Sequence, residues 1–348
     1  MPAVRPAGTL DAGGRQADRV RLIEMAHPAD VGWLQAQSDD LGKSGMNVRR
    51  RNTAVPRTAG PTVRSLRGFF LATFALSWGM GMLYVLFQAK VEAIFGPMGY
   101  TNPVFIFMVY APGIVGVFTV WRHYGLSGLG GFFRRFSLWR MSLSWWLVLL
   151  IGMPAVFYGA AAITGKLADP FPISSWSAVL PALLAMLFIG PIEELGWRGV
   201  ALPLLQRRFS PLWAGLLLGL LVAFWHTPSF LLSGTKQSAW AFWPFFFGVV
   251  AISVILTPMF NAGRGSLLVA FLFHAQMNNP VWPDAQPWDM WLFVATAVVV
   301  AVVNRKALLD RGAAVTTIVT PTDEPDTRND AVLTERSRGM EQETPAST

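Results

Sequence analysis

Eight apolar runs between residues 68 and 304 constrain the fold of this chain more than any other feature. An α-helix needs roughly 20 apolar residues to cross a bilayer, and several of the runs reach that length. The charged residues amount to only 14% of the 348 residues, whereas a soluble domain carries about 25%. We therefore expect an all-α, polytopic membrane protein of about eight transmembrane helices. The runs cover 68–89, 103–121, 141–164, 177–206, 211–232, 239–261, 265–280 and 287–304.

The third and seventh of these runs are the least regular. Pro154 interrupts the third run, and the seventh is short and ends in polar residues. A proline inside a helix removes one backbone hydrogen bond and kinks or breaks the helix. We therefore expect a break near Pro154.

Positive charge alternates between the loops that join these runs. Alternate connections are rich in arginine, while the others hold only Lys90, Lys166 and Lys236. The positive-inside rule places arginine-rich loops in the cytoplasm. It predicts eight crossings with both termini cytoplasmic, and it explains the net charge of +8 without any nucleic-acid partner. The basic residues of the cytoplasmic connections are Arg122, Arg134, Arg135, Arg140, Arg207, Arg208, Arg264, Arg305 and Lys306.

Composition divides the chain into three parts. Residues 1–67 contain 11 Lys and Arg but no long apolar run, and residues 305–348 are rich in Thr, Glu, Asp and Arg. Segments of this kind cannot bury enough apolar surface to fold alone, so we expect two disordered cytoplasmic tails. Residues 68–304 form the membrane domain. The chain has no cysteine, which excludes a disulfide framework and a cysteine nucleophile.

Few ionisable side chains interrupt the membrane runs. Glu193, Glu194 and Arg198 lie in the fourth run, His226 lies in the fifth and His274 in the seventh. Ionisable groups inside a membrane are costly, so each is a candidate for function. From the cytoplasmic ends of their runs, at 1.5 Å per residue, Glu193, His226 and His274 lie roughly 21, 22 and 15 Å deep. Three helices would therefore bring polar groups to a similar level.

Helical spacing separates the roles of the two glutamates. Glu194 and Arg198 are four residues apart and can pair on one helix face, which indicates a structural ion pair. Glu193 is rotated by about 100° from Glu194, so it has no obvious cation. A carboxylate without a cation is suited to act as a general base. Trp197 is expected to pack or to anchor the helix rather than to contact substrate.

Three short motifs together resemble one protein family. They are EELGWR at 193–198, VAFWHTP at 222–228 and HAQMN at 274–278. In this order they are similar to the CAAX protease and bacteriocin-processing family, also called CPBP or Abi, whose eukaryotic relatives are the type II CAAX prenyl proteases or Ras-converting enzymes. The resemblance covers about 180–280. One position departs from the family pattern. The family has an aromatic residue four positions before the histidine, whereas this chain has Val222 there; the aromatic residues Phe224 and Trp225 lie close by.

The resemblance implies an intramembrane endopeptidase of the cell membrane, with a catalytic cavity open to the cytosol. Glu193 and His226 would activate a water molecule, and His274 and Asn278 would form the oxyanion site. Glu194 would hold Arg198. No metal or other cofactor is implied. The substrate would be a peptide or protein, either membrane-bound or lipidated, and the other partner is the lipid bilayer.

Three other functions remain open at this point. Glu193, His226 and His274 make a two-histidine, one-carboxylate set, which a zinc-dependent membrane protease could use. Many members of the resembling family are known only as immunity or accessory membrane proteins, so a non-enzymatic role is a further alternative. A proton-coupled transporter is the weakest, because no inverted repeat is visible in the sequence.

Overall fold

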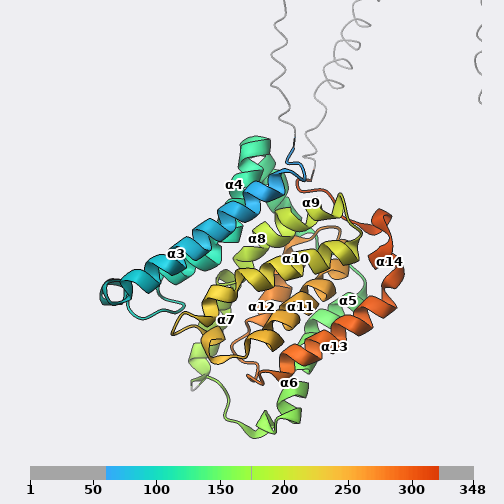
Figure 1. Cartoon of the computed structure of the whole chain (residues 1–348). Coiled ribbons are helices and arrows are strands. Elements are labelled where there is room, and N and C mark those ends of the chain that lie inside the picture. Colours follow the sequence, from blue (N-terminus) through green and yellow to red (C-terminus); the bar gives the residue numbers. More distant parts are fainter. Residues whose placement is uncertain (1–59, 174, 321–348) are drawn as a thin grey trace, which may run out of the picture. The chain divides into compact units, whose positions relative to one another are not determined.

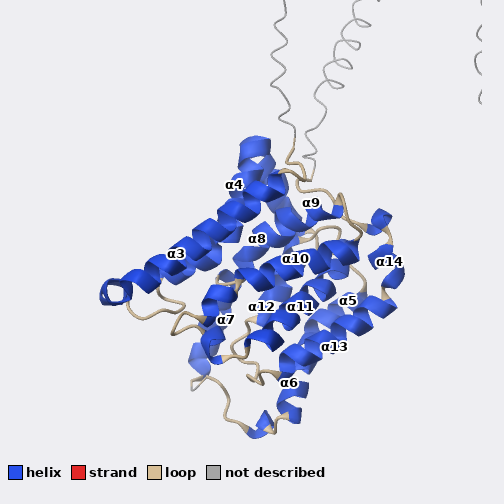
Figure 2. Ribbon diagram, in the orientation of Figure 1, coloured by secondary structure: helices blue, strands red, loops and turns tan. Residues whose placement is uncertain are grey.

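The computed structural model describes residues 60–173 and 175–320. Its ordered elements are all helices, with no strand among these residues (Figure 2). Six helical segments are long and apolar enough to cross a membrane. The all-α, polytopic fold expected from the sequence is thus confirmed. The six segments are Ser65–Phe95, Pro103–Ser137, Leu143–Ile163, Trp176–Gln206, Pro211–Phe230 and Phe242–Ala262.

The seventh and eighth apolar runs form shorter helices than expected. α12 (Leu267–Met277) has 11 residues and α13 (Trp288–Val303) has 16, and both are apolar. At 1.5 Å per residue, α12 is roughly 16 Å long and spans only part of a bilayer. The count of eight therefore divides into six long segments and two short helices.

α3 (Ser65–Phe95) and α4 (Pro103–Phe133) extend well beyond their apolar runs and lie together in Figure 1. Polar residues set the expected ends, but the helices continue through them with changes of direction at Phe87 and Gly125. Gly116 lets the backbone of α4 approach the segment around Gly196, because a Cβ on Gly116 would lie only 2.8 Å from the Cα of Gly196. This close approach holds α4 against the segment that carries the two glutamates.

The third span is irregular where the sequence predicts it. α5 (Leu143–Leu147) is followed by a π-helical turn at Val148–Gly152 and by α6 (Met153–Ile163). Pro154 lies at the start of α6, where a missing N–H costs least. The π turn absorbs the break, so the span continues to Ile163.

The fourth span is broken into short pieces, although the sequence predicts one helix. α7 (Trp176–Phe188) ends before Gly190. Gly190 has a φ of 98°, which glycine adopts readily and which is strained for other residues. A 3-10 turn, α8 (Glu194–Gly196), a π turn and α9 (Leu202–Gln206) follow. The glutamates therefore sit at a break in the helix, which directs them differently from the regular helix that we expected.

α10 (Pro211–Trp225) and α11 (Phe242–Ala262) pack closely, and α11 also packs against α13 (Figure 1). Small residues permit the first contact, since a Cβ on Gly219 would lie 2.9 Å from the Cα of Val250. Tight glycine packing is a common way for membrane helices to associate. The C-terminal end of α10 contacts α3 through Trp225 and Ser77, so α10 joins α3 to α11.

The segment after the last apolar helix folds back onto the rest of the unit. α14 (Arg305–Leu309) and a 3-10 turn at Arg311–Ala313 lead into an extended stretch up to residue 320. Buried Arg135 donates hydrogen bonds to the carbonyls of Ile318, Gly199 and Gly265 at 2.8–3.1 Å. Residues 305–320, which we assigned to a tail, thus include ordered structure because a buried guanidinium binds their backbone.

Most of both predicted tails lies outside the described residues. The first described residue is 60 and the last is 320, so both termini are beyond them. The expected cytoplasmic location of the termini therefore stays a prediction.

Candidate active site

The two glutamates occupy the break in the fourth span and have different partners. Glu193 belongs to the 3-10 turn Pro191–Glu193, and Glu194 begins α8. Both are buried, with 4% and 2% of their surface exposed. Burial at this level makes the partners of each carboxylate decisive for its role.

Glu194 binds a guanidinium and an imidazole. Its Oε1 lies 3.1 Å from Arg198 Nη1 and 2.8 Å from His274 Nδ1. The Arg198 contact is the i,i+4 pair that the sequence suggests. The His274 contact joins residues 80 positions apart, and the sequence analysis missed it. Glu194 thus connects the fourth span to α12.

Glu193 has no cation as a direct partner in the part of the chain that the structure describes. Its Oε2 accepts a hydrogen bond of 3.2 Å from Trp197 Nε1. Trp197 is fully buried, and its indole stacks or packs edge-on against rings that include Trp225. We expected Trp197 only to pack or anchor. It also orients the carboxylate of Glu193, a role that the four-residue spacing could have suggested.

His226 ends α10 and is held by its own helix. Its Nδ1 lies 2.8 Å from the carbonyl oxygen of Val222. Since a carbonyl only accepts, Nδ1 carries a proton and Nε2 is left to face other groups. The contact uses the backbone of Val222, so it does not require an aromatic side chain there. Trp225 and Phe245 pack edge-on against the imidazole, with ring centroids at 4.7 and 5.3 Å.

Trp225, which precedes His226, is held in place by residues of α3, a helix that carries none of the three motifs. Trp225 Nε1 donates to Ser77 Oγ at 2.9 Å, and Ser77 Oγ donates to the Met108 carbonyl at 2.7 Å. Trp78 Nε1 also donates to the carbonyl of Trp225 at 3.1 Å. The end of α10 is therefore anchored to α3 and α4 on one side and packed by α11 on the other.

His274 and Asn278 lie one turn apart at the end of α12, where Asn278 is the C-terminal cap. Gly190 shows where their nitrogens meet. A Cβ on Gly190 would lie 3.0 Å from His274 Nε2 and closer still to Asn278 Nδ2. Both nitrogens therefore lie next to the position that a Cβ of residue 190 would occupy. We call these two residues the His–Asn pair.

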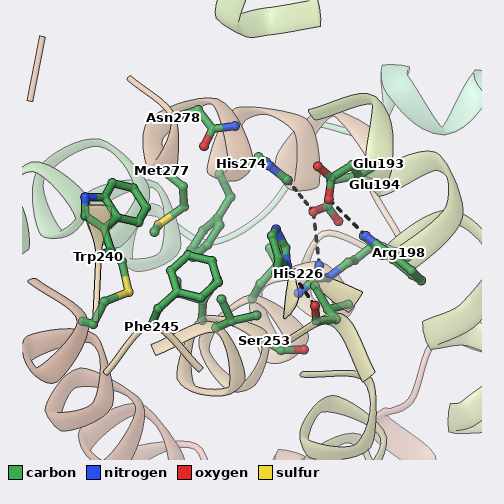
Figure 3. A pocket seen from close by; sticks show the side chains of 17 residues that line it. Glu193, Glu194, Arg198, His226, Trp240, Phe245, Ser253, His274, Met277 and Asn278 are labelled. Carbon is green, nitrogen blue, oxygen red and sulfur yellow. Dashed lines mark hydrogen bonds and ion pairs between the residues drawn. The ribbon is translucent and has the colours of Figure 1, made fainter. Parts of the chain in front are cut away.

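One cavity of about 110 Å³ brings the predicted residues together. Glu193, Glu194, Arg198, His226 and the His–Asn pair all line it, and Figure 3 shows His274 between Asn278 and the two glutamates. A cavity needs at least about 10–15 Å³ of such volume to hold one water molecule, so this one holds several. The remaining wall is largely apolar and includes Trp240, Phe245, Val249, Ile252, Met277 and Met290.

Three residues that shape this site were not predicted from the sequence. Gly190 leaves the space in which the nitrogens of the His–Asn pair meet, and Phe245 of α11 packs on His226. Ser77 of α3 supports the end of α10 through Trp225. For Gly190 a signal existed, because it follows an apolar helix and precedes Pro191, which is typical of a helix end.

The zinc alternative can be compared with this geometry. Among the described residues, no group of three or more His, Asp or Glu side chains is arranged to hold a metal ion. The Nδ1 atoms of His226 and His274 point to a carbonyl and to Glu194. A zinc-binding histidine commonly uses Nε2 while its Nδ1 donates to a carbonyl or carboxylate, so these Nδ1 contacts are compatible with either mechanism, and metal analysis decides between them.

Comparisons with known proteins agree with the motifs. The family described as type II CAAX prenyl endopeptidase Rce1-like matches residues 174–279, which contain every candidate residue of the cavity. A protein of Methanococcus maripaludis named CAAX prenyl protease 2 is 26% identical over 229 residues, which cover 60% of this chain and 81% of that protein. These matches support a type II CAAX protease of the CPBP family. The family and the named relative indicate a membrane protease, which is a peptide hydrolase.

Proposed function

We propose that the chain is an intramembrane endopeptidase of the glutamic type, in which Glu193 and His226 activate the attacking water. The observation that carries the proposal is the division of partners between the glutamates. Glu194 is bound by Arg198 and His274, whereas Glu193 lines the cavity and, among the described residues, has the Trp197 indole N–H as its one side-chain partner. Glu193 is therefore the carboxylate that remains able to take a proton from water.

The His–Asn pair is proposed to bind the oxyanion. Two nitrogen donors near one point match the requirement for stabilising the negative oxygen of a tetrahedral intermediate. His274 donates from Nδ1 to Glu194, so Nε2 donates as well only when the ring carries both protons. The carboxylate of Glu194 at 2.8 Å favours that charged ring. Glu194 would then serve as the counter-ion of both Arg198 and His274.

The proposed reaction consumes one water molecule for each peptide bond. The water donates one hydrogen bond to Glu193 and one to His226 Nε2, and its oxygen attacks the carbonyl carbon. Glu193 takes the proton while the carbonyl oxygen becomes the oxyanion. When the C–N bond breaks, the proton passes from Glu193 to the leaving amine. The products are a carboxylic acid and an amine, and Glu193 returns to its ionised form.

The apolar wall of the cavity supports an apolar peptide as substrate. Phe245, Val249, Ile252 and Met290 line the cavity beyond the polar cluster, and such a surface favours aliphatic side chains. The name of the relative, CAAX prenyl protease 2, makes a lipidated C-terminal peptide the first substrate to test. We propose a peptide or protein substrate at the membrane, in lipidated form.

The test compares purified wild-type protein with Glu193→Gln in detergent, using matched peptides with and without a prenyl group. Gln keeps the size of Glu and an oxygen to accept from Trp197, but it is no base. Removal of a general base typically costs 10²–10⁴-fold, so we expect about that loss in kcat. Cleavage by Glu193→Gln at the wild-type rate would overturn the proposal. Equal cleavage of the two peptides would overturn only the lipidated substrate.

A further inference from the structure

A second cavity lies beside the first, and Glu193 and His226 line both. It measures about 60 Å³. Its other walls come from α3, α4, Trp225 of α10 and the segment after α10. The first cavity is built from the motif segment and α10–α13. The two residues that we propose to activate water therefore separate two chambers.

The second cavity carries hydroxyl groups that can bind water. Ser77 Oγ donates to the Met108 carbonyl, Ser229 Oγ donates to the carbonyl of His226 at 2.6 Å, and Thr235 Oγ1 donates to the Ser229 carbonyl at 2.5 Å. All three residues line the cavity. Each hydroxyl has already donated its proton, and Ser77 Oγ and Thr235 Oγ1 also accept from Trp225 Nε1 and the Ser238 N–H. Each of these two oxygens has one further lone pair with which to accept from water. A buried water makes about three hydrogen bonds, which these oxygens, Glu193 and His226 can supply.

The volume of the second cavity fits water. It exceeds the 10–15 Å³ that one water needs, so it holds a few molecules. A substrate that binds the His–Asn pair fills the first cavity and displaces the water there. The water consumed in each turnover must then reach Glu193 and His226 from another side.

We propose that the second cavity is a water-binding site that supplies the hydrolytic water to Glu193 and His226 while substrate fills the first cavity. The inference rests on the proposed function, because it assumes that these two residues activate water. It assigns a task to α3 and α4, neither of which carries any of the three motifs.

Val109 of α4 gives a way to fill the second cavity after the protein has folded. Val109 lines the cavity and is half-buried, and the chain has no cysteine of its own. In Val109→Cys, methyl methanethiosulfonate would add an S-methyl group at this one position, with mass spectrometry to measure incorporation. Ile114→Cys is the matched control, because Ile114 lies on the same helix with 40% of its surface exposed. Val109→Phe provides a second, genetic way to fill the space.

The readout is kcat and KM for a peptide that the wild-type protein cleaves, together with the melting temperature. We expect modified Val109→Cys to lose about tenfold or more in kcat, with KM and melting temperature unchanged and recovery on reduction. Modified Ile114→Cys should keep the wild-type kcat. Complete modification of Val109→Cys with unchanged kcat, or a folded Val109→Phe with wild-type kcat, would overturn the inference. Glu193→Gln reports separately on the proposed function, so the two failures are distinguishable.

Discussion

Replacing Glu194 by Gln should destabilise the protein far more than the same change at Glu193. Glu194 is 2% exposed and binds Arg198 and His274 at 3.1 and 2.8 Å. Glu193 accepts a single hydrogen bond from Trp197, which the oxygen of Gln can also accept. The two substitutions are chemically identical and occupy adjacent positions, so each is a control for the other.

The expected magnitude follows from the buried charges. Breaking a buried ion pair by removing one partner costs about 3–5 kcal/mol, because the other charge stays buried without compensation. Arg198 is only 4% exposed, so Glu194→Gln should lose about that much unfolding free energy. Glu193→Gln should lose about 1 kcal/mol or less, which is the usual net value of one hydrogen bond.

A double variant separates charge from packing. In Glu194→Gln/Arg198→Met, the buried cation is gone, and Met fills much of the same volume. Replacing both partners of a buried pair is often nearly neutral. We therefore expect the double variant to recover more than half of the stability lost in Glu194→Gln. It should not recover activity, because His274 has still lost its carboxylate partner.

The assay is unfolding in detergent, followed by heat or denaturant, with activity measured on the same samples. A double variant no more stable than Glu194→Gln would refute the role of the unpaired Arg198 charge. Equal destabilisation by Glu193→Gln and Glu194→Gln would refute the division of roles between the two glutamates.

Three further predictions concern other parts of the structure. Gly190→Ala should lower kcat/KM about 100-fold or more by pushing a Cβ into the His–Asn pair, while Gly79→Ala, in open space, should retain activity. Arg135→Lys should lower the unfolding free energy, measured by denaturation, by about 3 kcal/mol, because hydrogen bonds from the guanidinium to backbone carbonyls are lost. Arg140→Lys, at an exposed arginine, is the control. Reporters fused after Lys236 should be active only outside the cytoplasm, and cytosolic activity would contradict the predicted topology.

Much of the fold follows from local sequence, because apolar length alone determines a transmembrane helix. The π turn before Pro154 and the six long segments have local causes. The true length of α3 does not follow from local sequence, since α3 continues past Lys90 to Phe95 and Val91 is buried in a cluster with Val104 and Met108 of α4. The break at Gly190 was not predicted, although Gly190 and Pro191 after an apolar helix are a local signal for a helix end. The closeness of Gly190 to His274 and Asn278 of the α12 end has no local signal, because these residues are far away in sequence.

The sequence predicted the motif residues of the candidate site, but it did not predict which residues of other helices contact them. The i,i+4 spacing gives the pair of Glu194 with Arg198, and the structure has that pair. The bond between Glu194 and His274 joins two helices, so no local pattern contains it. The same holds for Phe245 and Ser77, which support the end of α10 from α11 and α3.

The most direct test of the proposed chemistry is turnover after removal of metal ions. Wild-type protein would be dialysed against chelator, analysed for zinc and other metals, and then measured for peptide cleavage beside Glu193→Gln. If Glu193 and His226 activate water without an ion, the dialysed wild-type protein should keep its full kcat while Glu193→Gln stays at background. Inhibition by added zinc would not bear on the question, because an ion can block a Glu–His cluster that binds water. Reversible loss of activity on chelation, with about one zinc per active chain beforehand, would contradict the glutamic mechanism and favour a zinc protease.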